Sequence, residues 1–222
     1  MAALTYDICI GARYPLATRG RNIPLVMAPE KNVTLKNMTT MRVGGPARFF
    51  SRVTQIEELQ SMVDFARAGG FPVFVLGSGS NIIISDDGFA GVVIKIDMDD
   101  IVFEDAGDKV RATVMAGMDW DTFVKKSVYK NLYGLENLSL IPGTVGAAPV
   151  QNIGAYGQEI NEVVEWVEVF DTRTGNIKKL SNNECNFTYR DSIFKKEKDF
   201  IVLRVSFVLN MERGAEYKLQ RY

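Results

Sequence analysis

Apolar residues in the first half of the chain follow the spacing of a short alternation of strands and a helix. Residues 47–54 read as a strand, and a capping box at Thr54 and Glu57 then begins an amphipathic helix that ends at Gly69. Three short runs rich in Val and Ile follow and are typical of buried strands: 72–76, 81–84 and 91–96. This order predicts a small α/β unit.

The second half of the chain has the pattern of antiparallel hairpins. Two hairpins are expected at 101–115 and 163–180, and a long strand at 200–209 completes their sheet. Asp119 caps a helix between the hairpins, and Ser181 with Glu184 forms a second capping box. We therefore expect an α+β protein with an extended lead-in over residues 1–40 and order beginning near Met41. The α/β unit should cover 41–98 and the antiparallel unit 99–222.

Charge and targeting signals narrow the classes of function. The 222 residues carry 26 basic and 27 acidic side chains, and a net charge of −1 gives no field that would attract nucleic acid or an anionic membrane. No signal peptide and no long apolar run is evident. The two cysteines, Cys9 and Cys185, lie far apart and form no metal or redox motif. We expect a cytoplasmic monomer without metal, anchored to no membrane.

The chain contains no histidine, which excludes several kinds of catalysis. Hydrolysis by a Ser-His-Asp triad, zinc bound by histidine and histidine general-base chemistry all require the missing side chain. An enzyme of this composition would suit an organic cofactor that carries out the electron chemistry.

The first candidate motif is VLGSGSN at residues 75–81, where a strand runs into Gly and small polar residues. Glycines let backbone N–H groups turn toward a phosphate, and Ser and Asn add neutral hydrogen bonds. No helix or Lys follows as in the common nucleotide loops, and a tight turn between strands is the alternative interpretation.

The second motif is IPGTVGAAPVQNIGAYG at residues 141–157. Each glycine in a regular element costs about 0.5–1 kcal/mol relative to alanine, so this density indicates that something approaches the backbone closely. A flat aromatic ligand and its pyrophosphate would fit, with N–H donors from Gly146, Ala147 and Ala148 and the side-chain amide of Asn152. The alternative is a helix start packed tightly on a sheet.

The third motif is YRDSIFK at residues 189–195, which precedes the last strand. An arginine beside aromatic residues can present a fixed cation to a carboxylate or a developing oxyanion. A solvated loop arginine is the alternative for Arg190.

In this order and at these separations, the three motifs resemble those of the UDP-N-acetylenolpyruvoylglucosamine reductase family. TMRVGGPA at residues 40–47 resembles the family's opening segment, and the likeness covers roughly residues 37–222. The resemblance implies two flavin-binding subdomains of the vanillyl-alcohol-oxidase type, together forming one FAD-binding domain over 41–210. It also implies non-covalent FAD, NADPH as reductant and a UDP-sugar substrate. The product, UDP-N-acetylmuramate, is used in peptidoglycan synthesis.

The resemblance also assigns roles to residues. Arg190 matches the catalytic arginine thought to stabilise the enol-like intermediate, and Tyr189 and Tyr222 match substrate-binding positions. The cofactor would be held by Gly77, Ser78, Gly79, Ser80, Asn81, Gly143, Gly146, Ala147, Ala148, Gln151, Asn152, Gly154, Ala155 and Tyr156.

Family members continue into a third domain that supplies a serine acid and a glutamate, and we expect this chain to lack that domain. Two alternatives therefore stay open beside the reductase. The chain could be a catalytically silent FAD-binding fragment, or another flavin oxidoreductase of the same fold.

Overall fold

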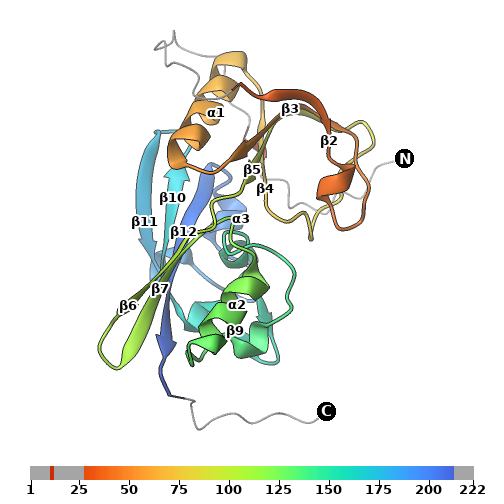
Figure 1. Cartoon of the computed structure of the whole chain (residues 1–222). Coiled ribbons are helices and arrows are strands. Elements are labelled where there is room, and N and C mark those ends of the chain that lie inside the picture. Colours follow the sequence, from red (N-terminus) through yellow and green to blue (C-terminus); the bar gives the residue numbers. More distant parts are fainter. Residues whose placement is uncertain (1–10, 13–27, 213–222) are drawn as a thin grey trace. The chain divides into compact units, whose positions relative to one another are not determined.

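A computed structural model describes residues 11–12 and 28–212 of the chain (Figure 1). The chain forms two compact units that divide after Met98, and the segment Asp171–Gly175 belongs with the first unit. Among the residues described, no helix combines the length and apolarity that a membrane crossing requires.

The first unit is built on one mixed sheet with the strand order β1-β4-β5-β3-β2. The two central pairings are parallel, with β3 and β4 on either side of β5, and both edge strands are antiparallel. The strands are β1 (Gly11–Ala12), β2 (Glu30–Thr34), β3 (Pro46–Val53), β4 (Val73–Leu76) and β5 (Phe89–Ile96). The α/β character expected for this part of the chain is confirmed.

The prediction that order begins near Met41 is wrong, because the sheet of the first unit starts earlier. Strand β2 pairs with β3 from Glu30 to Thr34, and the short 3-10 helix η1 (Lys36–Met38) follows. Leu35 is fully buried against Phe50 and Val93 in the core of this unit. The polar residues of β2 hid this strand, since only Val33 shows the apolar character expected of a buried strand.

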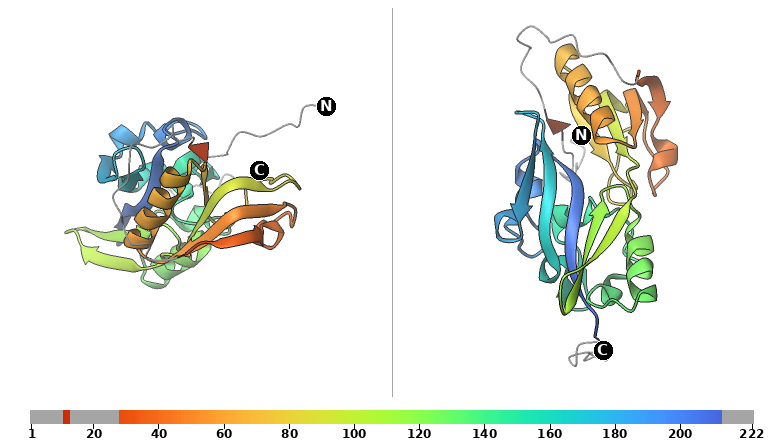
Figure 2. Two further views of the ribbon diagram at one scale, coloured as in Figure 1. Left: turned by 90° about the horizontal axis from the view of Figure 1, so that it is seen from above. Right: turned by 60° about the vertical axis from the view of Figure 1, so that its left-hand side comes forward.

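Helix α1 (Ile56–Gly69) packs against β3 and β5 of the same unit (Figure 2). Its capping box lies one residue later than predicted, with Gln55 as the cap and Glu58 as the partner. The Glu58 carboxylate accepts hydrogen bonds from the Thr54 and Gln55 backbone N–H groups, at 2.7 and 3.2 Å. Gly70 closes the helix in the left-handed conformation, with φ of 65°.

The strand predicted at 81–84 does not form. These residues lie in the loop between β4 and β5, although Ile82 and Ile84 pack against the core of the unit. The backbone of the loop bonds to another loop, because the Gly45 N–H donates to the Ser85 carbonyl at 2.8 Å. Burial of these isoleucines therefore does not require a sheet.

The second unit contains an antiparallel sheet of order β11-β10-β12-β7-β6 and a small separate pair, β8-β9. The large sheet consists of β6 (Ile101–Asp105), β7 (Lys109–Met115), β10 (Val164–Asp171), β11 (Asn176–Ser181) and β12 (Phe200–Asn210). The small pair is β8 (Gly154–Ala155) and β9 (Gln158–Glu159). Both predicted hairpins and the last strand are confirmed.

Short helices carry the connections of the second unit. Asp119 caps α2 (Trp120–Tyr129) by accepting from the Thr122 N–H at 2.8 Å, as predicted, and Ser192 caps α3 (Ile193–Lys196). The 3-10 helices are η2 (Glu136–Leu138), η3 (Ala148–Gln151), η4 (Ile160–Glu162) and η5 (Asn183–Cys185). The second capping box stands beside η5, where Glu184 accepts from the Ser181 N–H at 2.8 Å.

Three aromatic rings join α2 to the sheet of the second unit. Phe207 on β12 lies 4.9 Å from Phe123 and 6.0 Å from Trp120 between ring centroids, and all three side chains are buried. The Trp120 indole N–H donates to the Leu138 carbonyl at 2.8 Å. This cluster fixes the helix that leads into the glycine-rich run.

We expect Phe207→Ala to lower the free energy of unfolding by about 3–5 kcal/mol, because it opens a cavity among buried rings. Urea denaturation followed by circular dichroism measures the change. Tyr129→Ala is the matched control, since that side chain on α2 is 85% exposed. Equal losses from the two substitutions would contradict the role of the cluster.

Candidate functional site

The loop at residues 77–81 leaves the sheet of the first unit at the carboxyl end of β4. Strands β3, β4 and β5 are parallel, so their carboxyl ends lie along the same edge. Ligands of such sheets bind outside the carboxyl ends of the strands. The first sequence motif is therefore at the position where an α/β unit binds a ligand.

Gly79 lets this loop lie directly on another segment of the same unit. A Cβ atom at Gly79 would stand 2.0 Å from the Met38 carbonyl oxygen, and its φ of 70° favours glycine. The Gly79 carbonyl accepts from the Thr40 N–H at 3.0 Å. Within the described residues, the backbone N–H groups of Ser78 and Gly79 have no acceptor. These donors suit an anion such as a phosphate.

The remaining residues of the 77–81 loop are polar and partly open. Ser78 is exposed, and its hydroxyl bonds to the Ser80 hydroxyl at 3.1 Å. The Asn81 side chain is also exposed. Small size and neutral polarity allow a charged ligand to come close to the backbone.

Residues 39–45 support the loop, a role that the sequence motifs alone did not reveal. The Thr39 hydroxyl donates to the Val43 carbonyl at 2.9 Å, and Arg42 takes a left-handed conformation with φ of 53°. A Cβ atom at Gly45 would stand 2.0 Å from the Asp86 carbonyl oxygen. The resemblance of this segment to a family motif was its only signal in the sequence.

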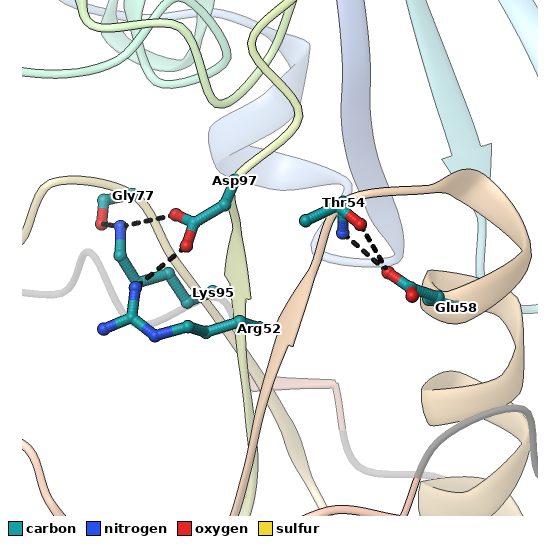
Figure 3. Close-up of polar contacts among 6 residues, drawn as sticks. All are labelled: Arg52, Thr54, Glu58, Gly77, Lys95 and Asp97. Carbon is teal, nitrogen blue, oxygen red and sulfur yellow. Dashed lines mark hydrogen bonds and ion pairs between the residues drawn. The ribbon is translucent and has the colours of Figure 1, made fainter.

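Charged residues meet at the same edge of the sheet (Figure 3). Asp97, directly after β5, pairs with Arg52 at 2.8 Å and with Lys95 at 3.1 Å. The Lys95 ammonium also donates to the Gly77 carbonyl oxygen at 3.2 Å. Sequence reasoning missed this group, because a lysine and an arginine on strands read as solvated positions.

The glycine-rich run of the second unit starts beside the N-terminus of α2. The Trp120 N–H donates to the Gly143 carbonyl at 3.1 Å, which ties the run to the helix. Gly143 has φ of 152°, and a Cβ atom there would meet no other atom within 4 Å. The surface at Gly143 is therefore open to a ligand.

The expected N–H donors at Gly146, Ala147 and Ala148 are already used inside the protein. The Gly146 N–H donates to the Ala116 carbonyl at 2.9 Å, and those of Ala147 and Ala148 to the Thr144 carbonyl. A Cβ atom at Gly146 would lie 2.6 Å from that of Ala116. The donor role is wrong for these residues, because the close approach inferred from their small size is made by the protein chain itself.

Asn152 is fully buried, and its amide also serves the protein. Its Nδ2 donates to a Glu159 carboxylate oxygen at 2.7 Å and to the Thr188 carbonyl at 3.1 Å. Its Oδ1 accepts from the Asn161 N–H at 3.2 Å. The expectation that this amide reaches a ligand is therefore wrong, and the side chain instead connects separate segments of the second unit.

Among the other predicted cofactor residues of this run, Gln151 ends η3, and the rest lie at the β8-β9 turn. Gly154 is buried, while Gln151 and Ala155 are half-buried. Tyr156 is 87% exposed and takes a left-handed conformation with φ of 54°. Its ring is open to a ligand of the second unit.

The YRDSIFK segment is bonded directly to the glycine-rich run. The Arg190 guanidinium donates to the Gly154 carbonyl at 2.6 Å, and the Ser192 hydroxyl to the Val150 carbonyl at 2.8 Å. The Lys195 ammonium donates to the Arg190 carbonyl, and Tyr189 is exposed. The structure thus brings the second and third motifs together, whereas Tyr222 lies outside the described residues.

Asp121 on α2 holds the residues that precede the glycine-rich run. Its carboxylate pairs with Lys125 at 2.6 Å and accepts from the Leu140 N–H and the Ser139 hydroxyl, each at 2.8 Å. The pKa of Asp121 is lowered to about 2, most strongly by the hydrogen bond from Lys125 and further by those from the Leu140 N–H and the Ser139 hydroxyl. Leu140 is thereby kept left-handed, with φ of 62°.

Residues 46–181 match the sequence family described as FAD binding domain. The chain belongs to this family. It is also 45% identical over 184 residues to the UDP-N-acetylenolpyruvoylglucosamine reductase of Thermobifida fusca, a match that covers 82% of this chain and 52% of the relative. The reductase of Pseudomonas aeruginosa is 39% identical, and the match covers 79% of this chain and 52% of the length of that reductase. The chain thus spans about half the length of these relatives.

Solved structures agree with the family match. The reductase of Thermus caldophilus, 34% identical, superposes with a TM-score of 0.69 over 85% of this chain and 64% of its own. p-Cresol methylhydroxylase is 17% identical and superposes with a TM-score of 0.56 over 78% of this chain and 37% of its own chain. This match shows a shared fold alone. The predicted α+β fold, the family resemblance and the FAD cofactor are confirmed by these matches.

The carboxylate of Asp121 should make the stability of the second unit depend on pH. Its pKa is lower in the folded protein, about 2, than the ordinary value of 3.8, so its stabilisation is complete above roughly pH 4 and is lost as the pH falls toward 2. We expect Asp121→Asn to cost about 1 kcal/mol at pH 6 and progressively less below pH 4.

Urea denaturation of the two proteins between pH 2 and pH 6 measures this difference. Asp108→Asn is the control, because Asp108 is an exposed carboxylate of the same unit. A cost of Asp121→Asn that stays constant down to pH 2 would show that the charge of Asp121 does not stabilise the fold.

Proposed function

We propose that the chain binds FAD non-covalently and that it is the FAD-binding part of a UDP-N-acetylenolpyruvoylglucosamine reductase. The observation that carries the proposal is the 77–81 loop at the carboxyl edge of parallel strands, with the Ser78 and Gly79 N–H groups without acceptors within the described residues. The match of residues 46–181 to an FAD-binding family supports the same conclusion.

The residues of each unit fit a part of FAD. The 77–81 loop offers backbone donors beside Lys95, which suits the pyrophosphate. In the second unit, the open backbone at Gly143 and the exposed Tyr156 ring suit a flat aromatic group such as the isoalloxazine. We propose residues 41–98 and 99–222 as the two flavin-binding subdomains, with the first extended backward to include β2.

In the proposed reaction, UDP-N-acetyl-3-O-(1-carboxyvinyl)-glucosamine is reduced to UDP-N-acetylmuramate for peptidoglycan synthesis, with NADPH as the reductant. Bound FAD would supply the chemistry that carries the hydride from NADPH to the UDP-sugar substrate. We propose a cytoplasmic location, because both the nucleotide sugar and NADPH are intracellular small molecules, and we propose that the chain is a monomer.

Arg190 is the residue of this chain proposed to act on the substrate. Its planar guanidinium has one N–H bonded to the Gly154 carbonyl at 2.6 Å, which orients the group. A fixed cation of this kind stabilises negative charge that develops on a carboxylate-enolate without reorganising during the reaction. Tyr189, exposed beside Arg190, is proposed to contact the substrate, and Tyr222 keeps the same predicted role.

A flavin-binding fragment without turnover is the second candidate, because the match covers about half of the reductases' length. The two proposals share FAD binding and differ in turnover. Another oxidoreductase of the same fold is a weaker alternative, since p-cresol methylhydroxylase shares only the fold with this chain.

The purified chain should be yellow, and denaturation should release FAD that chromatography separates from FMN. Gly79→Ala should abolish or strongly reduce this binding, because the added Cβ would overlap the Met38 carbonyl. Gly107→Ala is the matched control, since Gly107 also has a positive φ, of 85°, but a Cβ atom added there would meet no other atom within 4 Å. Wild-type protein that neither copurifies with FAD nor binds it when added would refute the proposal.

Turnover of the enolpyruvoyl substrate distinguishes the two candidates. Loss of NADPH absorbance that depends on the substrate would identify the reductase, and its absence in an FAD-loaded chain would favour the silent fragment. Where turnover is measured, Arg190→Lys should lower kcat by at least tenfold with FAD still bound, because a point ammonium cannot replace a planar fork. Unchanged kcat would remove Arg190 from the mechanism.

A further inference from the structure

Lys95 lies beside the point where the 77–81 loop begins. In the sheet of the first unit, Lys95 on β5 is level with Leu76 on β4 and with Arg52 on β3. Leu76 is the last residue of β4, so the next carbonyl along the chain belongs to the loop. The Lys95 ammonium reaches this carbonyl, that of Gly77, at 3.2 Å (Figure 3).

Planarity of the peptide bond transmits this contact to the loop. The carbonyl of Gly77 and the N–H of Ser78 belong to one peptide unit, and in a trans peptide they point in opposite directions. A Gly77 carbonyl held by Lys95 therefore turns the Ser78 N–H away from Lys95. The Thr40 N–H holds the Gly79 carbonyl in the same way, at 3.0 Å.

Asp97 keeps Lys95 in place. Its carboxylate binds the Lys95 ammonium at 3.1 Å through one oxygen and the Arg52 guanidinium at 2.8 Å through the other. The Lys95 side chain is only 19% exposed, whereas that of Arg52 is 52% exposed. Two cations share one carboxylate, so the group keeps a net positive charge beside the loop, which favours an anionic ligand.

We propose that Lys95 is a positioning residue for the pyrophosphate of FAD, which acts by fixing the Gly77 carbonyl so that the Ser78 N–H faces the ligand. Asp97 anchors Lys95 in this role. This inference rests on the proposed binding of FAD and adds to it a residue outside every sequence motif.

The test is the dissociation constant of FAD for the whole chain, measured by flavin fluorescence after removal of bound cofactor. Lys95→Met should raise it by about tenfold or more, because a charge-assisted hydrogen bond that orders the loop is lost. Lys95→Arg should stay close to wild type, since arginine can donate to both Gly77 and Asp97. Asp97→Asn should give a smaller loss, of about threefold, because it removes one anchor of Lys95.

Two controls separate positioning from general effects. Lys31→Met removes the same charge from an exposed site on β2 of the same unit and should leave FAD affinity unchanged. At saturating FAD, the visible spectrum of Lys95→Met should equal that of wild type, because the isoalloxazine is proposed to bind the second unit. An altered spectrum would show that the substitution disturbs more than the loop and would overturn the assignment.

The outcomes also separate this inference from the proposed function. Wild-type protein without FAD affinity would refute both, whereas tight wild-type binding with Lys95→Met within twofold of it would refute only the role of Lys95. If Lys95→Met does not fold, Asp97→Asn decides, and unchanged affinity in that variant would overturn the proposal. If Lys31→Met weakens FAD binding as much as Lys95→Met does, the loss comes from the change in net charge alone, and the proposed role of Lys95 is overturned.

Discussion

Parallel pairing of β3 and β4 with the central strand β5 determines how the first unit can present a ligand site. Because the three strands run in one direction, their carboxyl ends share an edge, and residues that are far apart in sequence meet there. The 77–81 loop leaves β4 at this edge, and Arg52, Lys95 and Asp97 lie beside it. With β4 reversed, Leu76 would lie at the opposite edge, away from Asp97.

The second unit brings its segments together by side-chain hydrogen bonds rather than by strand direction. Asn152 joins Glu159 to the loop before the YRDSIFK segment, and Ser192 joins that segment to η3. Asn152 and Ser192 are buried and Glu159 is half-buried, so the loss of one would leave others unpaired. The glycine-rich run and Arg190 are therefore one structure, although more than thirty residues separate them.

The sequence alone predicted the elements whose structure is determined by neighbouring residues. Helix α1, the cap at Asp119 and the hairpins follow from periodicity and turn chemistry, and the three motifs identified the family. Contacts between distant segments could not be read in the same way. Dense small residues at 146–148 correctly indicated a close approach, but only the fold shows that Ala116 makes it. Lys95 carried no signal, because its importance comes from the strand register.

Left-handed backbone is concentrated in the loops of the second unit that carry the candidate site. Leu140, Asn152, Tyr156 and Arg190 all have φ between 43° and 62°, a conformation that asparagine tolerates but that costs the other three residues about 1 kcal/mol or more each. Hydrogen bonds from neighbouring segments hold these loops, and a bound dinucleotide would add to them by mass action. The protein thus stores part of its conformational free energy at the proposed cofactor surface, and FAD bound there would lower the fraction of chains that unfold and become open to proteolysis.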